Sequence, residues 1–266
     1  VEDFGKEWLL FDQSPLSIEE RSLHFNSYFN IFPWNALTSD SVGFDAGCGS
    51  GRWAYLVAPR VGSLHCIEPS DSISVAKKNL SSFNNCVFHK ATIDSIPLED
   101  GSMDFGYCLG VVHHIPDTQK AIDDCTRKLK IGAPFLLYIY YKFDNKQTWF
   151  KYLWKISDIL RKVISKLPNR LRYFITQIIA TFVYYPLARF SLLLEKFGIK
   201  IDNIPLSVYR NRSFYSMRTD ALDRFGTRLE HRFTKKEIQT MMEKSGLKEV
   251  IFSNSAPYWC AVGVKK

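Results

Sequence analysis

The feature that most constrains the fold is an alternation of strand-like and helix-like patterns between residues 41 and 141. Parallel strands need crossover connections, which are usually helices, so this order predicts a parallel sheet with helices on both faces. The strand patterns fall in residues 41–45, 63–68, 86–91, 103–112 and 133–141, and the helix patterns fall in residues 51–59, 71–83 and 117–129. An earlier helix is expected at residues 17–32, where Ser17 and Glu20 fit a capping box.

The alternation stops near residue 142 and resumes near residue 232. The intervening segment is basic, aromatic and mostly helical in pattern, and three prolines interrupt it: Pro168, Pro186 and Pro205. After it, Thr234 and Glu237 predict the start of a helix that stops at Gly246, and two closing strands are expected in residues 247–255 and 258–264.

The composition suits one elaborated α/β domain. The 266 residues are 46% hydrophobic and 15% aromatic, enough to fill a sizeable core. We expect an N-terminal helical arm over residues 1–40, the α/β domain over residues 41–141 and 232–266, and a helical insertion over residues 142–231. The six cysteines form no C-x-x-C pair, which favours a reduced, cytoplasmic protein without a metal site.

The central stretch "VGFDAGCGSGRWA" places three glycines at alternating positions just after an apolar run. Such a strand-to-helix turn lets the backbone approach a ligand closely. No Gly-Lys-Ser/Thr follows, which excludes a P-loop, and the order G-x-G-x-G differs from the dinucleotide fingerprint G-x-G-x-x-G. Asp45 precedes the first glycine by two residues and would repel a pyrophosphate.

Two carboxylates indicate the ligand. Asp45 suits a positively charged ligand with an amino group, and Glu68 ends the next strand, 17 residues beyond Gly51, where a carboxylate can accept both hydroxyls of a ribose. A cationic adenosine derivative without phosphate satisfies both carboxylates. That description fits S-adenosylmethionine (SAM).

Five segments resemble the class I SAM-dependent methyltransferases that act on small molecules: "FDAGCGSG", "CIEPS", "ATIDSIPL", "MDFGYCLGVVHHIPD" and "LKIGAPFLLYIY". The resemblance covers about residues 40–141 and 232–264, and "DFGKEWLLF" resembles an aromatic arm of some bacterial members. It implies a Rossmann-like, doubly wound, seven-stranded, mostly parallel sheet with a reversed last strand. It also implies SAM as cofactor, S-adenosylhomocysteine as product, and a set of cofactor-binding residues: Asp45, Ala46, Gly47, Cys48, Gly49, Gly51, Glu68, Pro69, Thr92, Ile93, Leu109 and Trp8. Where many members have an acidic residue for the adenine amino group, this chain has Thr92, so its hydroxyl and the Ile93 backbone are expected to recognise adenine.

His113 and His114 follow the fourth predicted strand, whose carboxyl end faces the ligand crevice in such sheets. Either imidazole is a candidate general base. The alternative is that His113 packs structurally and His114 only lines the pocket.

The insertion allows several interpretations. Residues 141–230 hold 17 Lys and Arg against 7 Asp and Glu, a net charge of +10, whereas the remainder of the chain carries −2. Its helices are expected either as a lid or dimer interface, or as an amphipathic surface that contacts a membrane peripherally. We favour a lid over a soluble anionic substrate, because the apolar runs are short and interrupted. Four residues are candidate substrate contacts: Arg210, Arg212, Tyr215 and Arg218.

The sequence thus predicts a SAM-dependent methyltransferase that acts on a small molecule or on a lipid- or sugar-linked acceptor, by O- or N-methylation. One alternative is a nucleic-acid methyltransferase, which is not favoured because "CLGVVHH" lacks an Asn/Asp-Pro-Pro-aromatic run and the chain has no Pro-Cys nucleophile. The other is a membrane-associated, non-catalytic SAM-binding protein.

Overall fold

The computed structural model describes residues 11–266, so Trp8 lies outside the described residues. Its contacts divide the chain into two compact units. Unit 1 comprises residues 11–14, 21–142 and 229–266 of the described chain, and unit 2 comprises residues 15–20 and 143–228.

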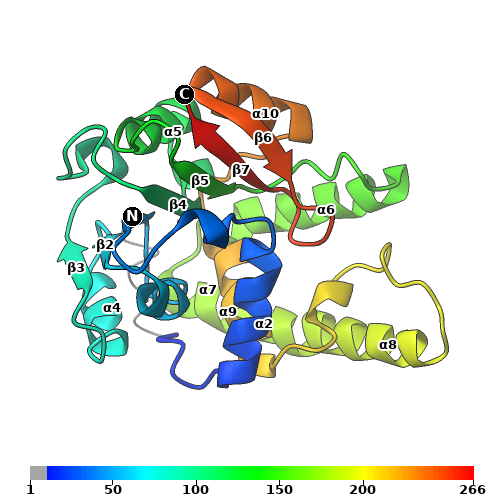
Figure 1. The fold of residues 1–266 in the computed structure, drawn as a ribbon. Coiled ribbons are helices and arrows are strands. Elements are labelled where there is room, and N and C mark those ends of the chain that lie inside the picture. Colours follow the sequence, from blue (N-terminus) through cyan, green and yellow to red (C-terminus); the bar gives the residue numbers. More distant parts are fainter. Residues whose placement is uncertain (1–10) are drawn as a thin grey trace. The chain divides into compact units, whose positions relative to one another are not determined.

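Unit 1 is built on a seven-stranded sheet with the order β3-β2-β1-β4-β5-β7-β6 (Figure 1). Strand β7 runs antiparallel to β5 and β6, and the pairs among the first five strands are parallel. The predicted seven-stranded, mostly parallel α/β fold is therefore confirmed. The strands are β1 (Val42–Ala46), β2 (Ser63–Ile67), β3 (Cys86–His89), β4 (Phe105–Leu109), β5 (Pro134–Tyr138), β6 (Leu247–Phe252) and β7 (Cys260–Lys265).

Helices cover both faces of this sheet, and each face has its own core. Phe44 and Phe135 face the core beneath α5 (Thr118–Arg127) and α10 (Lys235–Lys244). Phe105 and Tyr107 face the opposite core, to which the other helices contribute: α2 (Ile18–Phe29), α3 (Ala54–Val57) and α4 (Ile73–Asn79). Successive strand residues thus point to opposite faces, and both faces are buried, as a parallel sheet requires.

Local signals in the sequence explain most helix ends. Asp117 caps α5, and Thr234 with Glu237 forms the predicted capping box of α10. Gly246 follows α10 with a φ of 80°, the left-handed conformation typical of a helix stop. The helix expected at residues 51–59 is shorter than predicted, because the chain tightens into a 3₁₀ turn at Ala58–Arg60, which contains Pro59. Further 3₁₀ turns are η1 (Trp34–Ala36), η3 (Ile93–Ser95) and η4 (Val112–His114).

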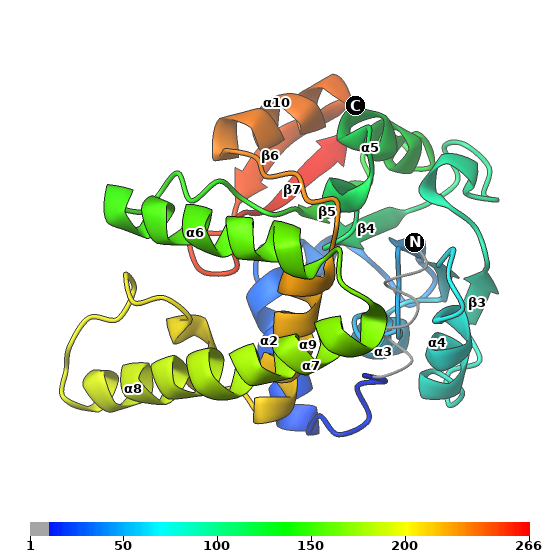
Figure 2. The same ribbon diagram turned by 180° about the vertical axis from the view of Figure 1, so that it is seen from behind.

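Unit 2 is helical and is organised around α9 (Phe214–Gly226) (Figure 2). Met217, Ala221 and Phe225 of this helix are buried in the core of the unit. Both α6 (Thr148–Ile164) and α7 (Asn169–Ile179) pack on it. The guanidinium of Arg161 donates to Thr227 O and that of Arg172 to Gly226 O, so two buried cations satisfy carbonyls at the C-terminal end of α9.

The interruption predicted at Pro186 does not occur. Helix α7, the π turn η5 (Ala180–Tyr184) and α8 (Tyr185–Lys196) join into one 28-residue helix from Asn169 to Lys196. The π turn lies directly before Pro186, where the proline ring and its missing N–H disturb ordinary helical hydrogen bonds, so the wider turn lets the helix continue. By length and composition this helix is apolar enough to cross a membrane, and 22% of its most apolar window is buried inside the protein.

Candidate functional site

The glycine turn after β1 requires glycine at two positions at least. Gly47 and Gly51 have φ angles of 83° and 79°, which other residues rarely adopt. A Cβ on Gly47 would lie 2.5 Å from Val111 Cγ2, and one on Gly51 would lie 2.9 Å from Leu80 Cδ1. The N–H groups of Gly47 and Cys48 both donate to the carbonyl of Ile67, at 2.8 and 3.0 Å, which fixes the turn against the end of β2.

Asp45, at the end of β1, is a buried carboxylate that the protein does not satisfy. It is 1% exposed, and its Oδ2 has no hydrogen-bond partner among the described residues. Burial raises the pKa of Asp45 to about 8 against the opposing influence of the neighbouring Tyr107 hydroxyl, and the negative charge of Glu68 adds to the rise. A buried acceptor of this kind is an incomplete site, which a cationic group would complete.

Glu68, directly after β2, holds the glycine turn. Its Oε2 accepts the N–H of Gly49 at 3.1 Å, while Oε1 accepts the N–H and the hydroxyl of Ser70. The side chain is 7% exposed. Because each carboxylate oxygen can accept more than one hydrogen bond, Oε2 keeps capacity for a ligand hydroxyl.

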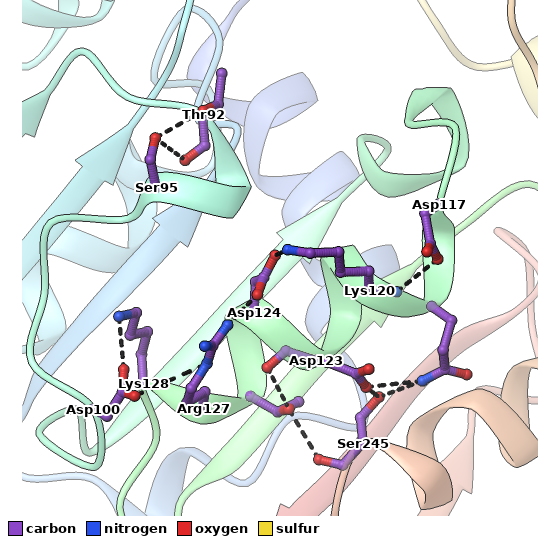
Figure 3. Close-up of polar contacts among 12 residues, drawn as sticks. Thr92, Ser95, Asp100, Asp117, Lys120, Asp123, Asp124, Arg127, Lys128 and Ser245 are labelled. Carbon is purple, nitrogen blue, oxygen red and sulfur yellow. Dashed lines mark hydrogen bonds and ion pairs between the residues drawn. The ribbon is translucent and has the colours of Figure 1, made fainter.

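The loop after β3 carries the residues predicted to recognise adenine. Thr92 is exposed, and its hydroxyl donates to Asp94 Oδ1. The same hydroxyl lies 2.8 Å from Ser95 Oγ (Figure 3). Ile93 is buried. Many members of the resembled family have an acidic residue at the position of Thr92. In this chain Asp94, two residues later and not singled out from the sequence, supplies a carboxylate in the same loop.

The two histidines after β4 have different surroundings. His113 is fully buried, neither ring nitrogen has a hydrogen-bond partner among the described residues, and the ring centroid lies 3.9 Å from that of Tyr140. Burial, with the neighbouring His114 and Arg232, holds the pKa of His113 well below its usual value, so this ring is neutral. His114 Nδ1 lies 2.7 Å from Leu229 O and must donate to it, which makes Nε2 the proton acceptor of the neutral ring.

The segment that carries these histidines is anchored through α5. Asp117 Oδ1 accepts the Lys120 N–H at the start of the helix. Further along, the hydroxyl of Ser245 donates to Asp123 Oδ1, while Asp124 pairs with Lys120 (Figure 3). These contacts tie α5 to the end of α10 and fix the chain that leaves β4.

The remaining predicted cofactor residues lie on the same edge of the sheet. Ala46 and Leu109 end β1 and β4 and are buried, and Pro69 follows Glu68. Cys48, in the glycine turn, is also buried. Among the described residues, no cluster of His, Cys, Asp and Glu is arranged to hold a metal ion.

The predicted substrate contacts lie in unit 2, and its arginines have partners there. Arg210 pairs with Glu195 at 2.7 Å and Arg212 with Asp220 at 3.5 Å. Arg218 donates to Gln177 Oε1 and to the hydroxyl of Tyr173, and Tyr215 lies half-buried in α9. A role of these four residues in substrate binding stays a prediction.

Sequence reasoning missed two buried polar groups near the turn. Tyr107 lies opposite Asp45 in the β1–β4 register, and its buried hydroxyl is close enough to lower the pKa of Asp45, although it makes no hydrogen bond of regular geometry among residues 11–266. Ser50 Oγ, in the glycine turn, is also buried without a hydrogen-bond partner among the described residues. The signal for Tyr107 was a polar hydroxyl in a strand that is otherwise apolar, at the position that pairs with Asp45.

Comparisons with known proteins agree with this geometry. Residues 44–137 match the family model of the methyltransferase domain. The ubiquinone biosynthesis O-methyltransferase of Nitrosomonas europaea is 32% identical over 98 residues, which are 36% of this chain and 42% of that enzyme. The chain spans about half the length of the curated relatives it matches.

Two solved structures share the fold. A provisionally named methyltransferase of Bacillus halodurans aligns with a TM-score of 0.53 at 13% identity, covering 86% of this chain and 71% of its own. A SAM-dependent methyltransferase of Thermotoga maritima, described as a possible histamine N-methyltransferase, aligns with a TM-score of 0.50 at 14% identity, covering 98% and 94%.

The strand order with its reversed last strand, the glycine turn and the matched segment define unit 1 as a class I methyltransferase domain. Residues 44–137 are thus similar to the methyltransferase domain family, and the fold agrees with that of solved methyltransferase structures.

Proposed function

We propose that the chain binds SAM at the glycine turn and transfers its methyl group to a small molecule or to a lipid- or sugar-linked acceptor. The observation that carries the proposal is the pair of buried carboxylates at this turn, one of which has an oxygen without a partner. The unpartnered Oδ2 of Asp45 suits a cationic ligand, and the positive φ angles at the turn leave room for close approach of a ligand to the backbone.

The residues of unit 1 divide the binding task. Asp45 would receive the positive end of the cofactor, while Glu68 would accept ribose hydroxyls and keep the turn in place. Thr92, Asp94 and the Ile93 backbone would meet the adenine. When bound, SAM supplies an electrophilic methyl group, so the protein's contribution is mainly to position the acceptor and to exclude water.

An acceptor hydroxyl or protonated amine must lose a proton when it is methylated, so it needs a base. The presence of candidate bases after β4 is the basis for proposing O- or N-methylation. His114 is the better candidate base of the two histidines, because its Nδ1–H is held by Leu229 O, which fixes the ring with Nε2 as its acceptor nitrogen. The ring of Tyr140 packs against the ring of His113 and restricts its position.

The test is incubation of the protein with methyl-labelled SAM and with separate polar-metabolite, glycolipid and phospholipid fractions. The proposal predicts label in one fraction and formation of S-adenosylhomocysteine in equal amount. A folded protein that binds SAM but labels none of the fractions, nor RNA or DNA added in parallel, would contradict the catalytic part of the proposal. Label in RNA or DNA alone would contradict the acceptor class.

A further inference from the structure

The helix from Asn169 to Lys196 buries mainly small and polar residues, together with Tyr184, and exposes many of its large apolar ones. Thr176, Ala180, Ala188 and Ser191 are fully buried, and they recur at the spacing of one helix face. The other face carries large exposed side chains: Leu171, Phe174, Ile178, Phe182, Phe190, Leu193 and Phe197. In a helix surrounded by water the arrangement would be the reverse.

Helix α6 shows a second apolar face that is turned outward. Its exposed members recur at intervals of three and four residues and therefore form one stripe: Trp149, Tyr152, Leu153, Ile156, Ile159, Leu160 and Val163. The opposite face of α6 is occupied by Arg161 and Ile164, which are buried. Contiguous exposed apolar surface of this kind marks a docking surface.

The charges around these stripes are mostly positive. Lys155 lies beside the α6 stripe, with Nζ 5.5 Å from the centre of the Tyr152 ring, and Lys166 follows the helix and is exposed. The acidic residue of α6, Asp158, is largely buried and pairs with Arg161 and Lys162. Residues 143–228 contain 16 Lys and Arg against 6 Asp and Glu.

The cations inside the long helix face the protein instead of the apolar stripe. Arg172 is buried and donates to Gly226 O, and Arg189 donates to the carbonyls of Arg210 and Arg212. The stripe itself is therefore free of charge along most of its length, with Arg170 near one end and Glu195 and Lys196 near the other. Glu195 pairs with Arg210.

We propose that the exposed apolar faces of α6 and of the helix from Asn169 to Lys196 dock unit 2 onto an anionic lipid bilayer. Apolar side chains enter the interfacial region, Trp149 and Tyr152 lie at the level of the headgroups, and the lysines meet lipid phosphates. Charge favours this occupant over a second copy of the chain, since two such surfaces would bring +10 against +10. The inference does not require the proposed methyl transfer.

The experiment is co-sedimentation of the full chain with vesicles of phosphatidylcholine, with and without phosphatidylglycerol, at low and moderate salt. We expect pelleting with the anionic vesicles that weakens with salt. The variants Ile159→Glu and Phe182→Glu, at side chains 63% and 72% exposed, should abolish it. The matched control is Ile131→Glu, whose side chain is 85% exposed in unit 1 and which should pellet like the unmodified chain.

A second pair of variants tests the charges. The double variant Lys155→Gln/Lys166→Gln should lower the vesicle partition coefficient about thirtyfold, since each basic residue near an anionic surface contributes about 1 kcal/mol. Lys236→Gln/Lys244→Gln, on exposed positions of α10, should leave it unchanged. Thermal unfolding and SAM binding of every variant show that it is folded, independently of vesicles.

Three results would overturn the proposal. The first is a folded chain that does not pellet with anionic vesicles at low salt. The second is an equal effect of Ile131→Glu and Ile159→Glu. The third is a dimer in sedimentation equilibrium that Phe182→Glu dissociates while vesicles bind neither form, which would assign the surface to self-association.

Discussion

Asp45 and Glu68 are two buried carboxylates with different surroundings, and the difference assigns them different tasks. Glu68 accepts three hydrogen bonds from Gly49 and Ser70. Asp45 is left with an unpartnered oxygen and a raised pKa. Glu68 therefore shapes the turn by itself, and we propose that Asp45 gains a partner from the ligand.

The raised pKa of Asp45 makes stability depend on pH. Because the folded pKa is about 8 and the ordinary value is 3.8, the folded chain holds a proton that the unfolded chain has lost between those values. The stabilising contribution is complete below pH 3.8 and is lost as pH rises toward 8, by at most about 1.4 kcal/mol per pH unit.

We predict that Asp45→Asn flattens this part of the profile. Chemical denaturation at pH 5 and pH 8 should show a smaller loss of unfolding free energy for the variant than for the unmodified chain. Asp40→Asn, at an exposed position, serves as the control and should keep the unmodified slope. Equal slopes for Asp45→Asn and the unmodified chain would remove Asp45 as the buried titrating group.

Glu68→Gln should weaken SAM binding at least tenfold. The substitution removes the charge that strengthens the hydrogen bonds to the turn and to the ribose, and a hydrogen bond to a charged group contributes about 1.5–3 kcal/mol. Calorimetric titration measures the affinity, and Glu99→Gln, at an exposed position of unit 1, should bind like the unmodified chain. Unchanged affinity in folded Glu68→Gln would exclude Glu68 from the cofactor site.

His114→Gln should lower kcat for the identified acceptor by about a hundredfold or more and leave SAM affinity unchanged, as expected for loss of a general base. His65→Gln provides the comparison, because His65 is a partly buried histidine whose Nδ1 contacts His89 Nε2. The base assignment fails if His114→Gln and His65→Gln have equal kcat values. It also fails if the activity lost in His114→Gln is explained by weaker SAM binding.

At the level of elements, the turn after β1 is the proposed place of ligand binding. Gly47 and Gly101 offer a matched pair, because both have positive φ angles, 83° and 67°, but only the Cβ at Gly47 would meet a neighbour, Val111. Gly47→Ala should therefore lower unfolding free energy by about 1–3 kcal/mol more than Gly101→Ala.

The same pair separates backbone strain from blockage of the turn. Gly101→Ala should bind SAM normally, whereas Gly47→Ala should bind it weakly when measured well below the unfolding temperature. Equal stability losses with normal SAM binding in both variants would show that Val111 gives way and that the turn tolerates a side chain.

The elements of unit 1 could be predicted because their signals are local. Apolar runs, Asp117, Thr234 and Gly246 mark strands and helix ends directly in the sequence, and the structure has all of these features. The continuity of the helix through Pro186 could not be predicted, because it depends on a π turn that neighbouring helices support. The exposed faces of α6 and α7 could not be predicted either, since periodicity gives the angle of an apolar stripe but not whether protein covers it.

At the scale of the whole molecule, the chain combines a class I methyltransferase domain with a basic helical unit. Asp45 and the glycines were predicted as site residues from the turn, and Glu68 from its place at the end of the next strand; their role in binding stays a prediction. The position of the Tyr107 hydroxyl opposite Asp45 depends on the pairing of β1 with β4. The ion pairs of Arg210 and Arg212 depend on the packing of unit 2. Long-range pairing of this kind leaves no mark in a local pattern.

We propose above all that the incomplete site at Asp45 binds the cationic cofactor. The most direct measurement is calorimetric titration of the whole chain with SAM at pH 7, in two buffers of different ionisation enthalpy. We predict one SAM per chain, with release of about one more proton than Asp45→Asn releases, because a cation favours the ionised carboxylate. Absence of SAM binding by the folded chain, or equal proton release by both proteins, would contradict the claim.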